Sequence, residues 1–320
     1  MTRGRPAPFA QGRRGHAFLA EVGDEGMAIT MRANLDLGLV GNCAYAALID
    51  RMGQVVWCCL PRFDGDPVFC HLLDENNAHG FFAIGLDRFA RSEQAYLANT
   101  AILTTRLFDE SGAGVEITDF APRFSHRGRR ARPLTLVRMV RPLNGAPRLQ
   151  IRLRPVFAWG ADRPEITRGS NHIRYVHPTR VLRLTTNTPV VYVIEERLFL
   201  LEEPIALILG PDEPLEGPVK ETAREFFERT RQYWRVWVRS LAIPYEWQEA
   251  VIRSAITLKL CSFEETGGIV AALTTSIPEA QNSGRNWDYR FCWLRDAYFV
   301  VRALNRVGAH QTMEDYLRYL

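Results

Sequence analysis

The densest group of chemically useful side chains lies in residues 285–296, which read Arg-Asn-Trp-Asp-Tyr-Arg-Phe-Cys-Trp-Leu-Arg-Asp. These twelve positions contain four aromatic residues, three arginines and two aspartates. An aromatic ring offers a flat apolar surface to the C–H face of a pyranose. A carboxylate held by an arginine makes charge-assisted hydrogen bonds to hydroxyl groups. The segment therefore predicts a sugar-binding site.

A helix is expected to begin within this segment. Trp293, Ala297, Val300 and Leu304 repeat at helical spacing. Asp296 would then stand in the first turn, where the helix dipole and the free amides favour a carboxylate. A purely structural alternative stays open at this point, in which Asp296 only caps the helix and Trp293 belongs to the core.

The residues from Leu35 to about Gly210 have the pattern of β-strands. Apolar and polar residues alternate from Leu149 to Arg154, and 181–186 and 190–194 are rich in β-branched residues. Short strands with little helix between them predict an antiparallel β-sandwich over residues 33–212.

The apolar spacing changes after the Pro/Glu-rich stretch 211–218. A linker helix is predicted within residues 213–242, because its apolar residues repeat at three and four. The start of an all-helical domain is predicted for 243–320. Its first helix would have an apolar stripe on one face (Trp247, Ala250, Val251, Ser254, Ala255, Leu258 and Cys261). A second helix would run from about Trp293 to Val307 and end near Gly308. A third would begin at Thr312-Met-Glu-Asp315, which has capping-box spacing.

Composition argues against several classes of partner. The net charge is only +4, and the basic run 127–132 lacks aromatic residues, so we expect a solvated loop and no nucleic acid. No apolar stretch reaches the about 18 residues that a membrane-spanning helix needs. The six cysteines lack C-x-x-C spacing and the seven histidines lack ligand spacing. We therefore expect reduced core cysteines, a cytoplasmic location, and neither metal nor cofactor. Residues 1–32 are expected to form a disordered tail.

Several motifs together resemble glycoside hydrolase family 15, the bacterial glucoamylase, glucodextranase and trehalase-like group. The resemblance covers nearly the whole chain from Leu35 onward. It is carried by residues 35–50, 56–69, 96–103, 118–123, and the stretch from Ile243-Pro-Tyr-Glu-Trp-Gln to Asp296.

The resemblance implies a β-sandwich, a linker helix and the first helices of an (α/α)6 barrel. It also implies inverting hydrolysis of an α-glucosidic bond by two glutamates that lie further along the family's barrel than residue 320. We accordingly name no catalytic residue here and expect the 320-residue chain alone to be inactive. The family's spacing Tyr-x-x-x-Trp-x-Arg-Asp falls on Tyr289, Trp293, Arg295 and Asp296, which would bind the non-reducing glucose. Trp287 and Asp288 are further candidates for that site, with anchoring of the loop as the alternative.

Two questions stay open at this stage. Within the enzyme class, trehalase, glucoamylase and glucodextranase activities are not distinguished. Outside it, the chain could be a non-catalytic β-sandwich protein that binds glycans or docks to a partner. Glu264, Glu265 and Glu279 are acids by type, but none has a partner carboxylate placed by spacing, so surface or capping roles are expected for them.

Overall fold

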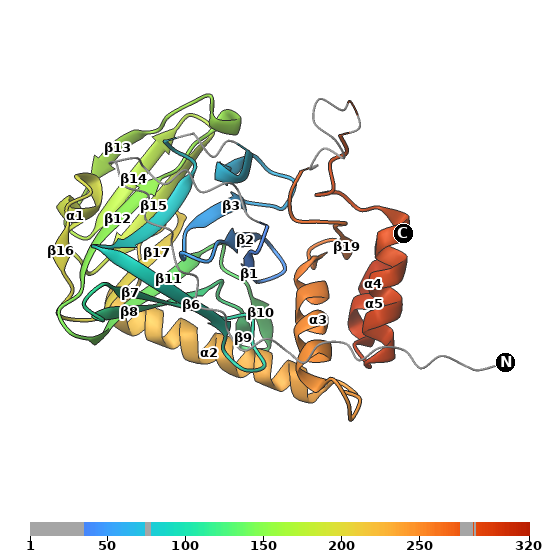
Figure 1. Ribbon diagram of the computed structural model, residues 1–320. Coiled ribbons are helices and arrows are strands. Elements are labelled where there is room, and N and C mark those ends of the chain that lie inside the picture. The colour runs from blue at the N-terminus through green and yellow to red at the C-terminus, as the bar shows by residue number, and fades with distance from the viewer. Residues whose placement is uncertain (1–34, 74–77, 276–283, 285) are drawn as a thin grey trace.

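The computed structural model describes residues 35–73, 78–275, 284 and 286–320. The predicted tail at residues 1–32 lies outside this part of the chain. Two antiparallel sheets lie face to face, α2 (Val219–Arg239) runs beneath them, and the other long helices stand to one side (Figure 1). Those helices are α3 (Gln248–Leu260), α4 (Leu294–Arg306) and α5 (His310–Tyr319).

The first sheet has seven strands among the described residues. Their order is β1 (Gly38–Gly41), β2 (Ala46–Ile49), β3 (Val55–Cys59), β5 (Phe81–Leu86), β12 (Arg148–Arg154) and β16 (Phe199–Leu200), with β4 (Pro67–Phe69) beside β3.

The second sheet has eight strands on the same basis. Their order is β13 (Glu165–Arg168), β14 (His172–His177), β15 (Arg180–Thr186), β17 (Ile205–Pro211), β11 (Leu136–Asn144), β8 (Gly114–Phe120), β7 (Leu103–Asp109) and β6 (Phe89–Tyr96). Two short hairpins stand apart from both sheets: β9 (Phe124–His126) with β10 (Arg129–Ala131), and β18 (Ser262–Phe263) with β19 (Gly268–Ile269).

One apolar core lies between the two sheets, as expected for a sandwich. In β12, Leu149, Ile151 and Leu153 are buried and the intervening residues are not, which confirms the predicted alternation. A fully buried arginine crosses this core: Arg138 of β11 pairs with Asp119 of β8 at 2.7 Å and donates to the Phe82 carbonyl in the other sheet. Such a pair is tolerated in a core because its hydrogen bonds are satisfied.

The predicted strand at 190–194 is wrong, because these residues form the short helix α1 (Val190–Ile194). Pro189 precedes it with φ −54°, and its carbonyl accepts the first turn bond from the Tyr192 amide. Val193 is buried in the sandwich core. β-Branched residues favour strands mainly because their side chains pack well against neighbouring strands. Here a short helix buries Val193 against the sandwich core, so these residues do not need a neighbouring strand.

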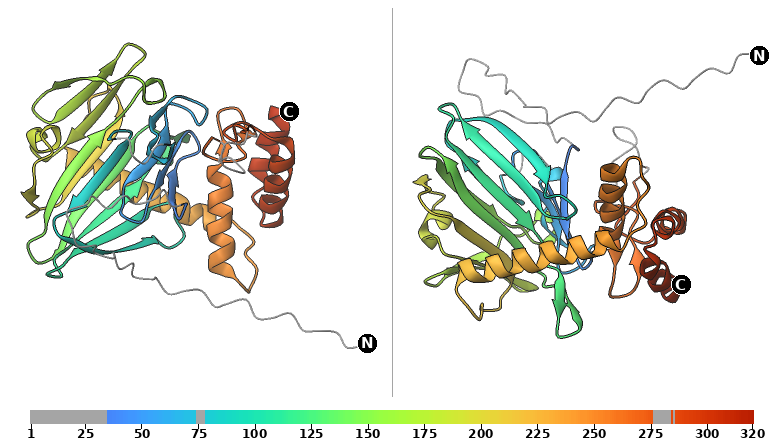
Figure 2. Two further views of the ribbon diagram at one scale, coloured as in Figure 1. Left: turned by 45° about the horizontal axis from the view of Figure 1, so that its top comes forward. Right: turned by 90° about the horizontal axis from the view of Figure 1, so that it is seen from below.

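Helix α2 joins the sandwich to the helical part (Figure 2). Its first half packs Val219 and Ala223 against the outer face of the eight-stranded sheet. Its second half packs the fully buried Trp234 against sandwich residues and against Ile256 of α3. The helix therefore fixes the position of α3 relative to the sandwich.

The side of α3 that meets the sandwich is not the predicted apolar stripe. Of that stripe only Ala255 is fully buried; the other buried residues of α3 are Ile256, Lys259 and Leu260. Trp247 is the exposed N-cap residue in the left-handed conformation. The helix is apolar on both sides, so periodicity could not tell which side meets the sandwich.

The end of α4 follows the prediction and the start of α5 does not. Gly308 has φ +80°, and its amide and that of Ala309 donate to the Asn305 and Leu304 carbonyls, which ends α4 in a Schellman motif. Helix α5 begins at His310, so Thr312 is a buried helical residue rather than a cap.

Candidate functional site

The predicted sugar-binding segment leads into the N-terminus of α4. Trp293 is the N-cap residue of this helix, with extended backbone. Before it, the chain is held beside residues 270–272, the segment that follows β19. The Ala271 amide donates to the Phe291 carbonyl (3.1 Å) and the Ala272 amide donates to the Tyr289 carbonyl (2.8 Å). These bonds give the loop a fixed path.

The structure brings three predicted aromatic residues together. The ring centroids of Tyr289 and Trp293 are 5.5 Å apart, and those of Trp287 and Trp293 are 6.3 Å apart with an edge-to-face arrangement. The Trp293 indole N–H donates to the Asp288 carbonyl at 3.1 Å. Trp287 is 51% exposed, so the cluster has an open aromatic surface at the molecular boundary.

Asp296 and Arg295 form an ion pair beside this cluster. The Arg295 Nη2 atom lies 3.1 Å from the Asp296 Oδ2 atom. Asp296 stands in the first turn of α4, and the Trp293 side chain makes no capping hydrogen bond. A carboxylate at this position can accept hydrogen bonds from two sugar hydroxyls, because its two oxygens have several lone pairs.

Asp288 has an anchoring role in the structure. It accepts hydrogen bonds from Arg290 Nε (3.0 Å) and Nη2 (2.7 Å). Burial alone would raise the pKa of Asp288, but the bonds from Arg290 outweigh burial and the pKa is lowered. Asp288 therefore stays ionised as the partner of Arg290.

Arg290, which the sequence pattern did not single out, fixes the loop to the sandwich. Its side chain is 4% exposed. It donates to the Gly65 carbonyl at 2.7 Å and lies 3.6 Å from the Cys59 sulfur, both in the sandwich. Its guanidinium also stands 4.8 Å from the centre of the Trp159 ring. The sandwich thus positions the segment that carries Tyr289 and Trp293.

Arg290→Gln is expected to lower the free energy of unfolding by about 1.5–3 kcal/mol, because it removes the charged donor to Asp288 and Gly65. Chemical denaturation of the chain measures this. Arg62→Gln is the matched control, since Arg62 makes an exposed pair with Asp64 at 3.0 Å that is worth less than about 1 kcal/mol. Equal shifts for the two variants would contradict the anchoring role.

Glu264 forms the centre of a second ionic cluster, between the sandwich and α3. Its carboxylate lies 2.5 Å from Arg123 Nη2 and 3.0 Å from Lys259 Nζ. Arg130 and Arg132 of the basic run each approach it to 3.5 Å. The Glu264 amide donates to the Cys43 carbonyl.

The predicted surface or capping role is therefore wrong for Glu264, whose side chain is 6% exposed. Burial would raise the pKa of Glu264, but the charges of Arg123 and Lys259 outweigh burial and lower it to about 2. The basic run is likewise not wholly solvated, because Arg132 faces this carboxylate. Glu265 is exposed, and Glu279 lies outside the described residues.

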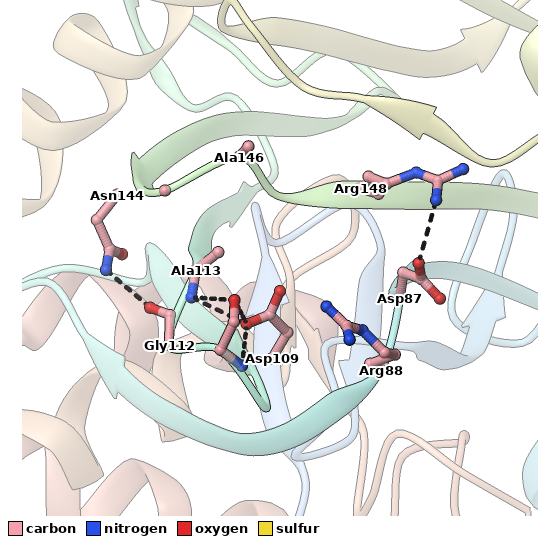
Figure 3. A pocket seen from close by; sticks show the side chains of 10 residues that line it. Asp87, Arg88, Asp109, Gly112, Ala113, Asn144, Ala146 and Arg148 are labelled. Carbon is pink, nitrogen blue, oxygen red and sulfur yellow. Dashed lines mark hydrogen bonds and ion pairs between the residues drawn. The ribbon is translucent and has the colours of Figure 1, made fainter.

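A separate surface depression of about 330 Å³ lies on the sandwich (Figure 3). Three strand-connecting turns line it. Asp109 accepts hydrogen bonds from the amides of Ser111 and Ala113, and Arg148 pairs with Asp87 at 3.7 Å. These polar groups satisfy one another within and between the turns, so the depression is not favoured as the site.

The described ranges contain no group of three His, Cys, Asp or Glu side chains arranged to hold a metal ion. Over the same residues, no helix has the length and apolar character to cross a membrane. The six cysteines are thiols rather than disulfides, and Cys43, Cys58, Cys59 and Cys70 are buried in the core.

Comparison with known proteins identifies relatives of both halves of the chain. Residues 29–195 match the family described as "Trehalase-like, N-terminal", and residues 246–320 match "Glycosyl hydrolases family 15". These matches confirm the resemblance found in the sequence motifs.

The individual relatives are named trehalases. The chain is 30% identical to a trehalase of Thermoplasma volcanium over 88% of its own length and 46% of the relative. It is 29% identical to a trehalase of Mycolicibacterium smegmatis (89% and 46%) and 31% identical to trehalase 1 of Sulfolobus acidocaldarius (84% and 45%). The chain spans a little under half the length of these relatives. It belongs to glycosyl hydrolase family 15, in the group with a trehalase-like N-terminal domain.

Proposed function

We propose that the complete protein containing this chain is an inverting glycoside hydrolase that cleaves α-glucosidic bonds, with trehalose as the leading substrate. Membership of the family supports the reaction class, and the trehalase relatives support the substrate. The observation that carries the proposal is the arrangement of Tyr289, Trp293 and Asp296 at the N-terminus of α4.

Each side chain of this arrangement has a proposed role. Asp296 and Arg295 bind the 4- and 6-hydroxyls of the terminal glucose, and Tyr289 and Trp293 pack against its ring. Trp287 extends the aromatic surface. Asp288 acts indirectly, because its contacts with Arg290 and Trp293 hold the loop.

The proposal also divides the chain into three parts. The sandwich over 33–212 supports the site, the linker over 213–242 carries α2, and the helices of 243–320 belong to an (α/α)6 barrel. An inverting reaction needs an acid and a base carboxylate about 6.5–9.5 Å apart. We assign neither to a residue of this chain.

Glu264 is not proposed as the general acid. A general acid has to carry its proton near the working pH. The pKa of Glu264 is lowered to about 2, and its carboxylate is engaged with Arg123 and Lys259. Glu264 therefore stabilises the contact between the sandwich and α3 through these ion pairs.

The stereochemistry of the products tests the proposal. The complete protein is incubated with trehalose, maltose and isomaltose, and the anomer of the released glucose is followed by proton NMR. Cleavage with inversion releases β-glucose from the α-linked unit before mutarotation. Early release of α-glucose alone would contradict the inverting mechanism. Binding of a glycan without any cleavage would favour the non-catalytic glycan-binding alternative.

A further inference from the structure

Trp159 of the sandwich contacts the loop that carries the proposed site, because the Arg290 guanidinium lies over one face of its ring. It lies in the short 3-10 turn η2 (Ala158–Gly160), and 47% of its surface is exposed. Its backbone has φ 57°, and that of Ala158 has φ 47°. Bulky residues rarely adopt this left-handed conformation, because it costs free energy that the surrounding structure has to offset.

The turn that carries Trp159 is held rigidly. The Asp66 carboxylate accepts hydrogen bonds from the Ala158 amide (2.8 Å) and the Trp159 amide (2.9 Å). Below the turn, Phe157 is fully buried and stacks on His177 with a centroid separation of 4.6 Å. The backbone that carries the indole therefore has a fixed position before any ligand arrives, which lowers the entropy lost on binding.

The indole is connected to the proposed glucose site through two residues. Its ring contacts the Arg290 guanidinium at 4.8 Å. Arg290 is bonded to Asp288, and the Asp288 carbonyl accepts the Trp293 indole N–H. Trp159 and Trp293 thus lie at the two ends of one short chain of contacts, although they come from the sandwich and from α4.

We propose that Trp159 binds the sugar unit adjoining the glucose held by Asp296. This inference rests on the proposed function and adds a substrate-binding residue from the sandwich. A half-exposed indole on a fixed turn offers the flat apolar surface that the C–H face of a second pyranose needs. The sandwich would then help to select disaccharides over free glucose.

The test compares Trp159→Ala with Trp159→Phe in the complete protein. For the best disaccharide substrate, Trp159→Ala is expected to raise KM about 5- to 30-fold, since it removes the apolar contact of one ring face. Trp159→Phe keeps an aromatic face and is expected to restore most of the loss. Ile166→Ala, an exposed apolar residue of the same sandwich, is expected to leave KM unchanged.

Inhibition by free glucose separates binding from an indirect effect. Glucose fills only the site of Asp296, so its inhibition constant is expected to be the same for Trp159→Ala and wild type. An unchanged disaccharide KM would overturn the inference, and so would equal weakening of glucose and disaccharide, which would mean that Trp159 acts through Arg290. If wild type cleaves no α-glucoside, the proposed function fails and this inference with it. If Asp296→Asn impairs cleavage but Trp159→Ala does not, only this inference fails.

Discussion

Glu264→Gln is expected to lower the free energy of unfolding by about 3–5 kcal/mol at pH 7, because it leaves the buried Arg123 and Lys259 without their shared anion. Urea denaturation of the chain and of the variant measures this. Glu265→Gln is the matched control: the neighbouring residue is exposed, so its substitution should shift stability by no more than about 0.5 kcal/mol. A small effect at both positions would contradict the structural role of Glu264.

The same carboxylate predicts an acid-dependent loss of stability. The ordinary pKa of Glu264 is 4.5 and its pKa in the folded chain is about 2. The folded state thus favours the anion, so the contribution is complete above pH 4.5 and is lost as pH falls toward 2. The difference corresponds to about 3 kcal/mol. Melting temperatures of wild type and Glu264→Gln are expected to converge across this window, and a constant gap would contradict it.

Asp296→Asn is expected to lower kcat/KM of the complete protein about 10- to 100-fold on its best α-glucoside, since a charge-assisted hydrogen bond becomes a neutral one. The loss should fall mainly on kcat, because holding the sugar distorted helps most near the transition state. The melting temperature should hardly change. Asp315→Asn is the control, because Asp315 pairs with Arg318 on the next helix at 2.5 Å and not with Arg295 or the aromatic cluster. A lowered melting temperature with normal activity per folded molecule would favour the structural alternative for Asp296.

Much of the architecture could be predicted from local pattern. The alternation in β12 and the change to helical spacing in α2 identify a sandwich followed by helices, because each element buries one face. Prediction failed where burial decides the outcome. Residues 190–194 have the composition of a strand but form a helical turn on the sandwich core, and α3 is apolar on both sides, so only the fold shows which side is covered.

The aromatic and acidic residues of the site could be predicted because they are close together in the sequence. Trp287, Tyr289 and Trp293 meet in the structure, as their density suggested. The supporting residues could not be found in this way. Arg290 contacts the Cys59 sulfur and the Gly65 carbonyl, which lie more than 200 residues earlier in the chain. Glu264 pairs with Arg123, which is also distant in the sequence. Only the fold brings such pairs together.

The most direct test of the site is a thermodynamic cycle between Asp296 and one sugar hydroxyl. The complete protein and its Asp296→Asn variant are assayed on the best α-glucoside and on the same substrate lacking the 4-hydroxyl of the terminal glucose. If Asp296 binds that hydroxyl, each change alone costs kcat/KM, and the two together cost little more than one, with a coupling of about 1–3 kcal/mol. Fully additive losses would show that Asp296 does not contact the 4-hydroxyl and would contradict the proposed glucose site.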